Sequence, residues 1–142
     1  ILMINCKLYF EVFEEFEKAE TKADRIAVLR KYDHPRFRDF LVYALNSTVE
    51  FDVEIPNWRP AVEPAGLNYT YLEIEVPKLY RFVKNHPQRP EGLSPDKQKQ
   101  LLVVVLESLH KDEAQILVDV ITKKFKVNNL TKKLVQEAYP GI

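Results

Sequence analysis

Apolar residues recur at intervals of three and four along most of the chain, with charged residues between them. In the first part this spacing predicts three amphipathic helices. The first covers residues 8–16, the second follows a break at Glu20-Thr21, and the third begins at His34-Pro35 because proline suits the first turn of a helix. The predicted inward-facing residues are Leu8, Tyr9, Val12, Phe13, Phe16, Ile26, Leu29, Tyr32, Phe37, Phe40, Leu41, Ala44 and Leu45.

Residues 49–71 have a different pattern. Phe51, Val53 and Ile55 alternate with two acidic residues, which is the period of a strand. Three prolines and a glycine follow and exclude long regular elements. This Pro-rich stretch also contains a tryptophan and two tyrosines, so we expect an irregular but ordered connection that includes a short extended piece.

The helical spacing returns in the second half. Residues 76–83 carry one apolar stripe, and Ser94-Pro95-Asp96 is a strong helix start. The helix that follows is apolar on nearly every side over residues 101–106 and is predicted to be the central buried one. Asp112 is predicted to cap another helix, and a turn at residues 126–129 leads to a last short one. The sequence therefore predicts an all-α fold: a single domain, residues 1–142, of six or seven short helices.

The charge is balanced overall but uneven along the chain. The 142 residues include 21 basic and 21 acidic side chains. Residues 1–76 hold 9 basic and 14 acidic residues, whereas residues 77–142 hold 12 and 7. The chain thus has an acidic half and a basic half. A uniformly basic nucleic-acid-binding domain is excluded, but a basic face on a neutral protein is not.

The sequence also restricts the cellular setting. No stretch approaches the roughly 18 consecutive apolar residues of a membrane helix, and acidic residues directly after Phe10 do not fit a signal peptide. We expect Met3 to be the native start, with Ile1 and Leu2 added to it. The single cysteine, Cys6, cannot form an internal disulfide and is expected as a small buried residue, with a catalytic thiol as the alternative. A cytoplasmic protein without membrane contact is predicted, in the host cytoplasm if a phage encodes it.

Catalytic and cofactor motifs are absent from the sequence. The three histidines lie at predicted helix boundaries, and no HExxH or Cys/His metal-ligand spacing occurs. No GxSxG or Gly-rich phosphate motif occurs either. The acid pairs Glu14-Glu15 and Asp112-Glu113 fall on predicted solvent faces of helices. We therefore expect a protein that is not an enzyme and that has no metal or cofactor.

The basic residues of the C-terminal third gather around one predicted turn between two helices. The turn and its flanks comprise Lys123, Lys124, Lys126, Asn128, Asn129, Thr131, Lys132 and Lys133. Lysines and the free amides of a helix start can together hold phosphates. Alternatively, lysines at a helix end complement its dipole and remain solvated. The residues alone leave both interpretations open.

Both ends of the chain contain short elements that resemble those of a known family. Residues 112–142, DEAQILVDVITKKFKVNNLTKKLVQEAYPGI, contain a helix, the short element Phe125-Lys126-Val127-Asn128 and a last helix closed by Tyr139-Pro140-Gly141. Residues 9–45 supply three short helices, including Ala27-Val28-Leu29-Arg30-Lys31-Tyr32. The arrangement resembles the N-terminal helical domain of ATP-dependent DNA ligases, especially the T-even phage type. Ile55-Pro56-Asn57-Trp58 stands where those ligases carry an aromatic, lysine and Trp-Pro stretch.

The resemblance implies an all-helical, non-catalytic module that grips duplex DNA mainly through backbone phosphates. In ligases, nucleotidyl transfer belongs to a following domain with a Lys-x-Asp-Gly motif, which does not occur here. The resemblance thus implies a stand-alone phage accessory protein in DNA replication or repair, with little sequence specificity. The implied contacts are the turn residues named above, the amides at the start of the last helix, and Arg89 as an outlying contact.

The sequence departs from the ligase pattern at three places. Asn128 replaces a turn glycine, and asparagine tolerates the left-handed conformation. Glu50, Asp52 and Glu54 replace a lysine-bearing stretch and would repel phosphates. The loop before the central helix has a different sequence from that of the ligases, although its Arg89 could still contact a phosphate.

A protein–protein interaction module is the second hypothesis. Its surface would be the acidic half and the aromatic residues Trp58, Tyr69 and Tyr71, and its partner a replication or host protein. The alternative for these aromatics is packing beneath the long connection.

Overall fold

The computed structural model describes residues 7–142, so the expectations for Met3 and Cys6 lie outside the described residues. The helices within that range are α1 (Tyr9–Lys18), α2 (Lys22–Lys31), α3 (Pro35–Leu45), α4 (Leu72–Glu75), the 3-10 helix η1 (Val76–Phe82), α5 (Pro95–Ser108), α6 (Lys111–Ile121) and α7 (Lys132–Ala138). The all-α prediction is confirmed. None of these helices is long and apolar enough to cross a bilayer.

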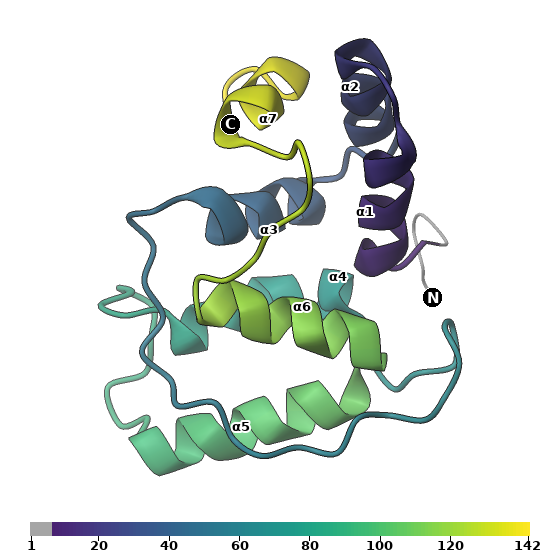
Figure 1. Ribbon diagram of the computed structural model, residues 1–142. Coiled ribbons are helices and arrows are strands. Elements are labelled where there is room, and N and C mark those ends of the chain that lie inside the picture. The colour runs from purple at the N-terminus through teal and green to yellow at the C-terminus, as the bar shows by residue number, and fades with distance from the viewer. Residues whose placement is uncertain (1–6) are drawn as a thin grey trace.

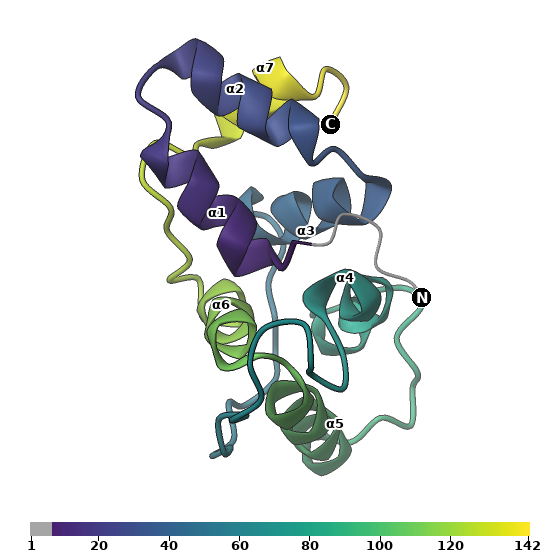
Figure 2. The same ribbon diagram turned by 90° about the vertical axis from the view of Figure 1, so that its right-hand side faces the viewer.

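The helices are arranged in tiers (Figure 1). α5 and α6 pack together at one end, and α3 crosses the middle, where it contacts η1 and α6. α2 and α7 pack against each other at the opposite end, although they are far apart in sequence (Figure 2). α1 joins the two ends, because it contacts both α2 and α6. An ion pair between Lys22 and Glu137, 2.9 Å apart, adds to the α2–α7 contact.

Most helices begin where the sequence predicts, and polar side chains cap them. The Ser94 hydroxyl accepts the Lys97 N–H at 3.2 Å at the start of α5, and Thr21 caps α2 in the same way. The start of α6 corrects the sequence analysis. Its N-cap is His110 rather than Asp112, and the ring Nδ1 of His110 accepts the Asp112 N–H at 3.0 Å. The prediction failed because an imidazole nitrogen can replace the usual capping oxygen.

Aromatic rings form the centre of the core. Tyr9 packs against Phe37 and Phe40 with ring centroids 5.1 Å away in each case. Phe13 lies beside the same two rings of α3 and also contacts Phe125 edge-on at 5.4 Å. Tilted and edge-on aromatic pairs contribute about 1 kcal/mol each beyond the burial of their surface. The cluster therefore fixes α1 against α3 and holds the chain that leaves α6.

Two helix predictions need correction. Residues 76–82 form a 3-10 helix after the four-residue α4, instead of one α-helix over 76–83. The helix over residues 101–106 is not buried on nearly every side, because Val104 is 64% exposed. Leu102, Val105 and Leu106 face the core, and the outer side of α5 is open to solvent.

The connection between α3 and α4 is irregular, as predicted, with one short extended piece. Phe51 and Val83 form an antiparallel bridge, in which the Asp52 N–H reaches the Phe82 carbonyl at 3.0 Å. The connection then follows α5, where the Arg59 N–H reaches the Glu107 carboxylate at 2.9 Å. The many prolines therefore stand in a segment whose backbone bonds go to α5 and η1 rather than to a sheet.

A buried carboxylate ties three helices together. Glu113 of α6 is 1% exposed, and its two oxygens accept the N–H groups of Tyr9 at 2.8 Å and Leu72 at 3.0 Å. These are the first residues of α1 and α4, where the helix dipole favours a negative group. The prediction that Glu113 faces solvent is wrong. Burial nevertheless outweighs these bonds and raises the pKa of Glu113 to about 7.

Candidate nucleic-acid interface

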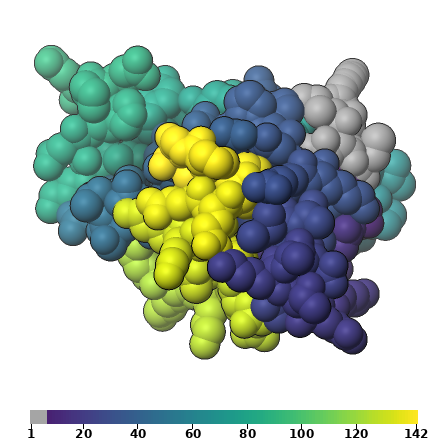
Figure 3. Space-filling model, turned by 90° about the horizontal axis from the view of Figure 1, so that it is seen from above, coloured from purple at the N-terminus to yellow at the C-terminus, as the bar shows by residue number. Residues whose placement is uncertain are grey.

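The predicted DNA-binding residues other than Arg89 lie on the segment that leads from α6 into α7, residues 122–133, here called the lysine strap. It runs from the end of α6 to the α2–α7 end of the molecule (Figure 1). Together with α7 it forms a continuous part of one face, next to α1 and α2 (Figure 3). Leu130 of the strap is buried, and Phe125 and Val127 are partly buried against the core. The strap is thus anchored by apolar side chains rather than laid loosely on the surface.

The strap begins with a specific helix-ending turn. The Lys124 N–H donates to the Asp119 carbonyl at 2.8 Å, and the Lys123 N–H to the Val120 carbonyl at 3.3 Å. This is the paired pattern of a Schellman motif. Lys123 takes the left-handed position with φ of 61°, where glycine is usual. The motif reverses the chain and brings Lys124 and Lys126 off the end of α6.

A second turn follows at the two asparagines. The Leu130 N–H closes it onto the Val127 carbonyl at 3.0 Å, and Asn129 has a left-handed φ of 69°. The sequence predicts the left-handed residue at Asn128, and this prediction is wrong by one position. Asn128 instead donates its backbone N–H to the Glu17 carboxylate at 2.9 Å. An acidic residue of α1 therefore holds the turn.

Four lysines of the strap are exposed and carry unneutralised charge. They are Lys124, Lys126, Lys132 and Lys133. Within residues 7–142 no carboxylate oxygen lies within 4.0 Å of their ammonium groups. The positive charge that the sequence analysis located at this turn is therefore available to an external anion.

Lys123 is placed differently from these four. Its ammonium lies 3.4 Å from the Asn46 carbonyl and 5.7 Å from the centre of the Phe51 ring. Partial burial lowers the pKa of Lys123. This lysine fastens the strap to the end of α3 and to the connection after it.

One of the amides at the start of α7 already has a partner within the chain. Thr131 is the N-cap of this seven-residue helix, and its hydroxyl accepts the Leu134 N–H at 3.1 Å. With Asn128 bonded to Glu17, two amides of this region already have partners within the chain. These two amides are therefore not free to bind a phosphate.

Arg89 lies outside the lysine strap, and its charge is already paired. Its guanidinium forms an ion pair with Asp52 and donates to the Val83 carbonyl at 3.2 Å. The sequence predicts Arg89 as an outlying DNA contact and gives no sign of this pairing, because Asp52 and Arg89 are distant in sequence. Arg89 stabilises the turn after η1 instead.

The acidic residues of the connection are paired in the same manner. Glu50 lies 3.9 Å from Lys84, and Glu54 lies 3.4 Å from Lys99. With Asp52 and Arg89, the three acids expected to repel phosphates each face a basic residue from the second half. The opposite charges of the two halves therefore meet along this connection and partly cancel there.

The histidines serve local structure. In His34, His86 and His110, the ring Nδ1 accepts the backbone N–H two residues further on, at 3.0–3.1 Å. Within residues 7–142, no three His, Cys, Asp or Glu side chains gather in a metal-binding arrangement. The three histidines therefore act as caps and turn-forming residues in the described part of the chain.

The fold and this surface define a small all-α domain with an anchored, lysine-bearing segment between its last two helices. The chain belongs to a family of unknown function (DUF6433), whose family model matches residues 12–127. No curated protein and no solved structure matches it. The family match runs from within α1 through α6 to the first part of the strap. The resemblance to ligase domains stays a prediction.

Proposed function

We propose that this protein is a non-catalytic DNA-binding module that contacts duplex phosphates through Lys124, Lys126, Lys132 and Lys133. The observation that carries the proposal is the exposure of these four lysines on one anchored strap, with no acidic partner among residues 7–142. As part of the same proposal, the protein is a cytoplasmic phage accessory factor in DNA replication or repair.

The physical basis is counterion release. Duplex DNA carries one charge per about 1.7 Å of its axis, and each lysine that neutralises a phosphate releases a condensed cation. Phosphate contacts carry no sequence information, so binding has little sequence specificity. Phe125 and Leu130 hold the strap before DNA arrives, which reduces the ordering cost of binding.

The acidic residues of the connection repel DNA phosphates less strongly than their number indicates, because they are paired. Glu50, Asp52 and Glu54 each lie beside a basic side chain of the same molecule. A paired carboxylate projects a weaker field at a distance, because the opposite charge beside it forms a dipole. Glu17 contacts the strap directly, because its carboxylate accepts the Asn128 N–H.

Fluorescence anisotropy with a labelled duplex of about 20 base pairs at low salt tests the proposal. The double variant Lys124→Glu/Lys126→Glu is compared with Lys97→Glu/Lys111→Glu. Both change the net charge equally, and the control lysines are exposed on other helices. We expect the strap variant to weaken binding at least about tenfold more than the control. A wild-type protein that does not bind the duplex, or an equal loss in both variants, contradicts the proposal.

One observation supports protein interaction as a second candidate function. Val62, Leu67 and Tyr69 of the long connection are 91%, 70% and 88% exposed. Trp58, by contrast, is partly buried against the core, and the Tyr71 hydroxyl donates to the Gly66 carbonyl at 2.9 Å. Affinity capture from host lysate with wild type and with Leu67→Ser/Tyr69→Ser tests it. A protein retained by wild type and lost by the variant, with DNA binding unchanged, favours this second function.

A further inference from the structure

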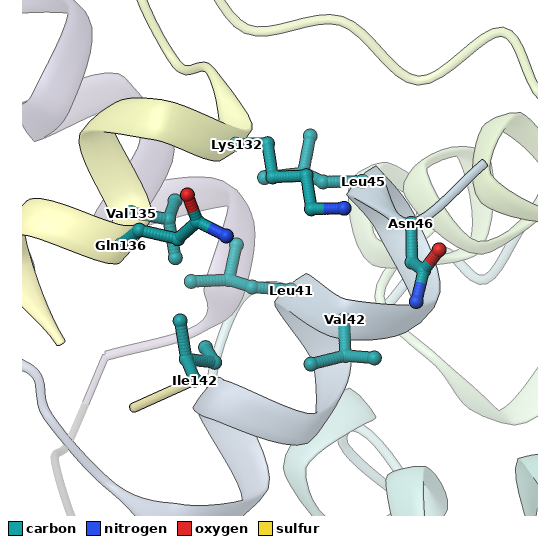
Figure 4. Close-up of a pocket in the computed structure, with 8 residues that line it drawn as sticks. All are labelled: Leu41, Val42, Leu45, Asn46, Lys132, Val135, Gln136 and Ile142. Carbon is teal, nitrogen blue, oxygen red and sulfur yellow. The ribbon is translucent and has the colours of Figure 1, made fainter. Parts of the chain in front are cut away.

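A groove opens between α3 and α7, beside the lysine strap. Leu41, Val42 and Leu45 of α3 form one wall, and Val135 of α7 together with Ile142 forms the other. Figure 4 shows these side chains turned toward one another around the groove. Its volume is about 220 Å³, and its lining is mostly apolar. The groove was not expected from the sequence, which placed Leu41 and Leu45 wholly on an inward face.

The size of the groove selects the kind of occupant. Small-molecule and cofactor sites usually measure about 300–1,000 Å³, which is larger than this groove. An apolar cavity of about 150 Å³ holds benzene, so 220 Å³ holds one aromatic side chain. Aromatic residues seated in small apolar pockets are the typical anchors of protein–protein interfaces.

The rim of the groove determines the charge of the occupant. Its polar lining residues are Lys132, Asn46 and Gln136, and no carboxylate side chain lines it. The Asn46 side-chain oxygen already accepts the Thr48 N–H at 3.0 Å and hydroxyl at 2.8 Å, so its NH₂ group is the part of the amide that can serve an occupant, as a donor. Lys132 has no carboxylate within 4.0 Å among residues 7–142. A cation and an amide donor beside an apolar pocket complement an acidic group next to an aromatic one.

We propose that the α3–α7 groove docks a single aromatic side chain from an acidic segment of a partner protein. The ring enters between Val42, Leu45 and Val135, and the acidic residue beside it pairs with Lys132. This site is separate from the exposed connection around Tyr69. It does not require DNA binding, although both proposals use Lys132.

The probe is a fluorescein-labelled peptide with one central tryptophan flanked by aspartate and glutamate, together with its Trp→Ala counterpart. Binding is followed by anisotropy and by the methyl NMR signals of Val42, Leu45 and Val135. We expect saturable binding of the tryptophan peptide, shifts of these methyl signals, and at least a fivefold weaker affinity for the alanine peptide. Val42→Lys, on the partly exposed wall, is expected to abolish binding while the protein stays folded.

The neighbouring lysines supply a matched control. Lys132 and Lys133 are the first two residues of α7, but only Lys132 lines the groove. Lys132→Glu is expected to weaken peptide binding at least tenfold and Lys133→Glu less than twofold. Equal losses in the two variants, equal binding of the two peptides, or binding without shifts of the groove methyl signals would overturn the proposal. A duplex DNA that shifts the methyl signals while the peptide does not would overturn it as well.

Discussion

Glu17, at the end of α1, accepts the backbone N–H of Asn128 at 2.9 Å and so fixes the turn of the lysine strap. The same carboxylate places a negative charge among the lysines proposed to bind DNA. Glu17→Gln keeps an oxygen acceptor for Asn128 and removes the charge. One charge at about 8 Å in water is worth about 0.5 kcal/mol, so we expect duplex affinity to rise about twofold. Anisotropy at low salt measures this, and weaker binding by Glu17→Gln would contradict the placement of the DNA.

Arg89 provides a second test of where DNA binds. Because it pairs with Asp52, removing both side chains leaves the net charge unchanged. Arg89→Ala/Asp52→Ala is expected to retain duplex affinity within about twofold, whereas Lys126→Ala loses an unpaired cation and binds several-fold more weakly. The same titration measures the affinity, and circular dichroism checks that the fold is intact. A large loss of duplex affinity in the double variant would show that Arg89 contacts the DNA.

Glu113 predicts a pH dependence of stability. Its folded pKa of about 7 lies above the ordinary value of 4.5, so the folded protein retains a proton that the unfolded chain loses. This contribution to stability is fully present below pH 4.5 and is lost as the pH rises through about 7. The shift corresponds to roughly 3 kcal/mol. Between about pH 5 and pH 8, urea unfolding should show wild type losing stability relative to Glu113→Gln. A constant difference between the two proteins would refute the assignment.

Tyr139 tests the contact between α2 and the end of α7. Its hydroxyl donates to the Leu29 carbonyl, one of the last carbonyls of α2, and the ring is fully buried. Tyr139→Phe preserves the ring and leaves this carbonyl without its donor. We expect the free energy of unfolding to fall by about 1–3 kcal/mol. Chemical denaturation measures it, and Tyr43→Phe is a suitable control because no hydrogen bond of its hydroxyl occurs within the described residues.

Local signals in the sequence predicted the helices well. Proline at the first position and serine at the cap identified the start of α5, and His34-Pro35 identified that of α3. The predictions that failed depend on distant neighbours. The residues next to Glu113 in the sequence are typical of an exposed helix face. In the fold, however, its carboxylate is buried and accepts the backbone N–H groups of Tyr9 and Leu72.

The candidate site shows the same division. The cluster of lysines is visible in the sequence, and all of its residues except Arg89 lie on one strap. Which of those charges is free depends on pairs such as Asp52 with Arg89 and on the bond from Asn128 to Glu17. The groove between α3 and α7 is lined by residues about 90 positions apart, such as Leu45 and Val135, so no local sequence pattern predicts it.

The salt dependence of duplex binding tests the central claim most directly. Four lysine–phosphate contacts predict that the logarithm of the association constant falls with the logarithm of salt concentration with a slope of about −4. The Lys124→Glu/Lys126→Glu variant is expected to reduce the slope by about 2, and Lys97→Glu/Lys111→Glu to leave it unchanged. Absence of duplex binding at low salt, or a slope that the strap variant does not change, would contradict the account.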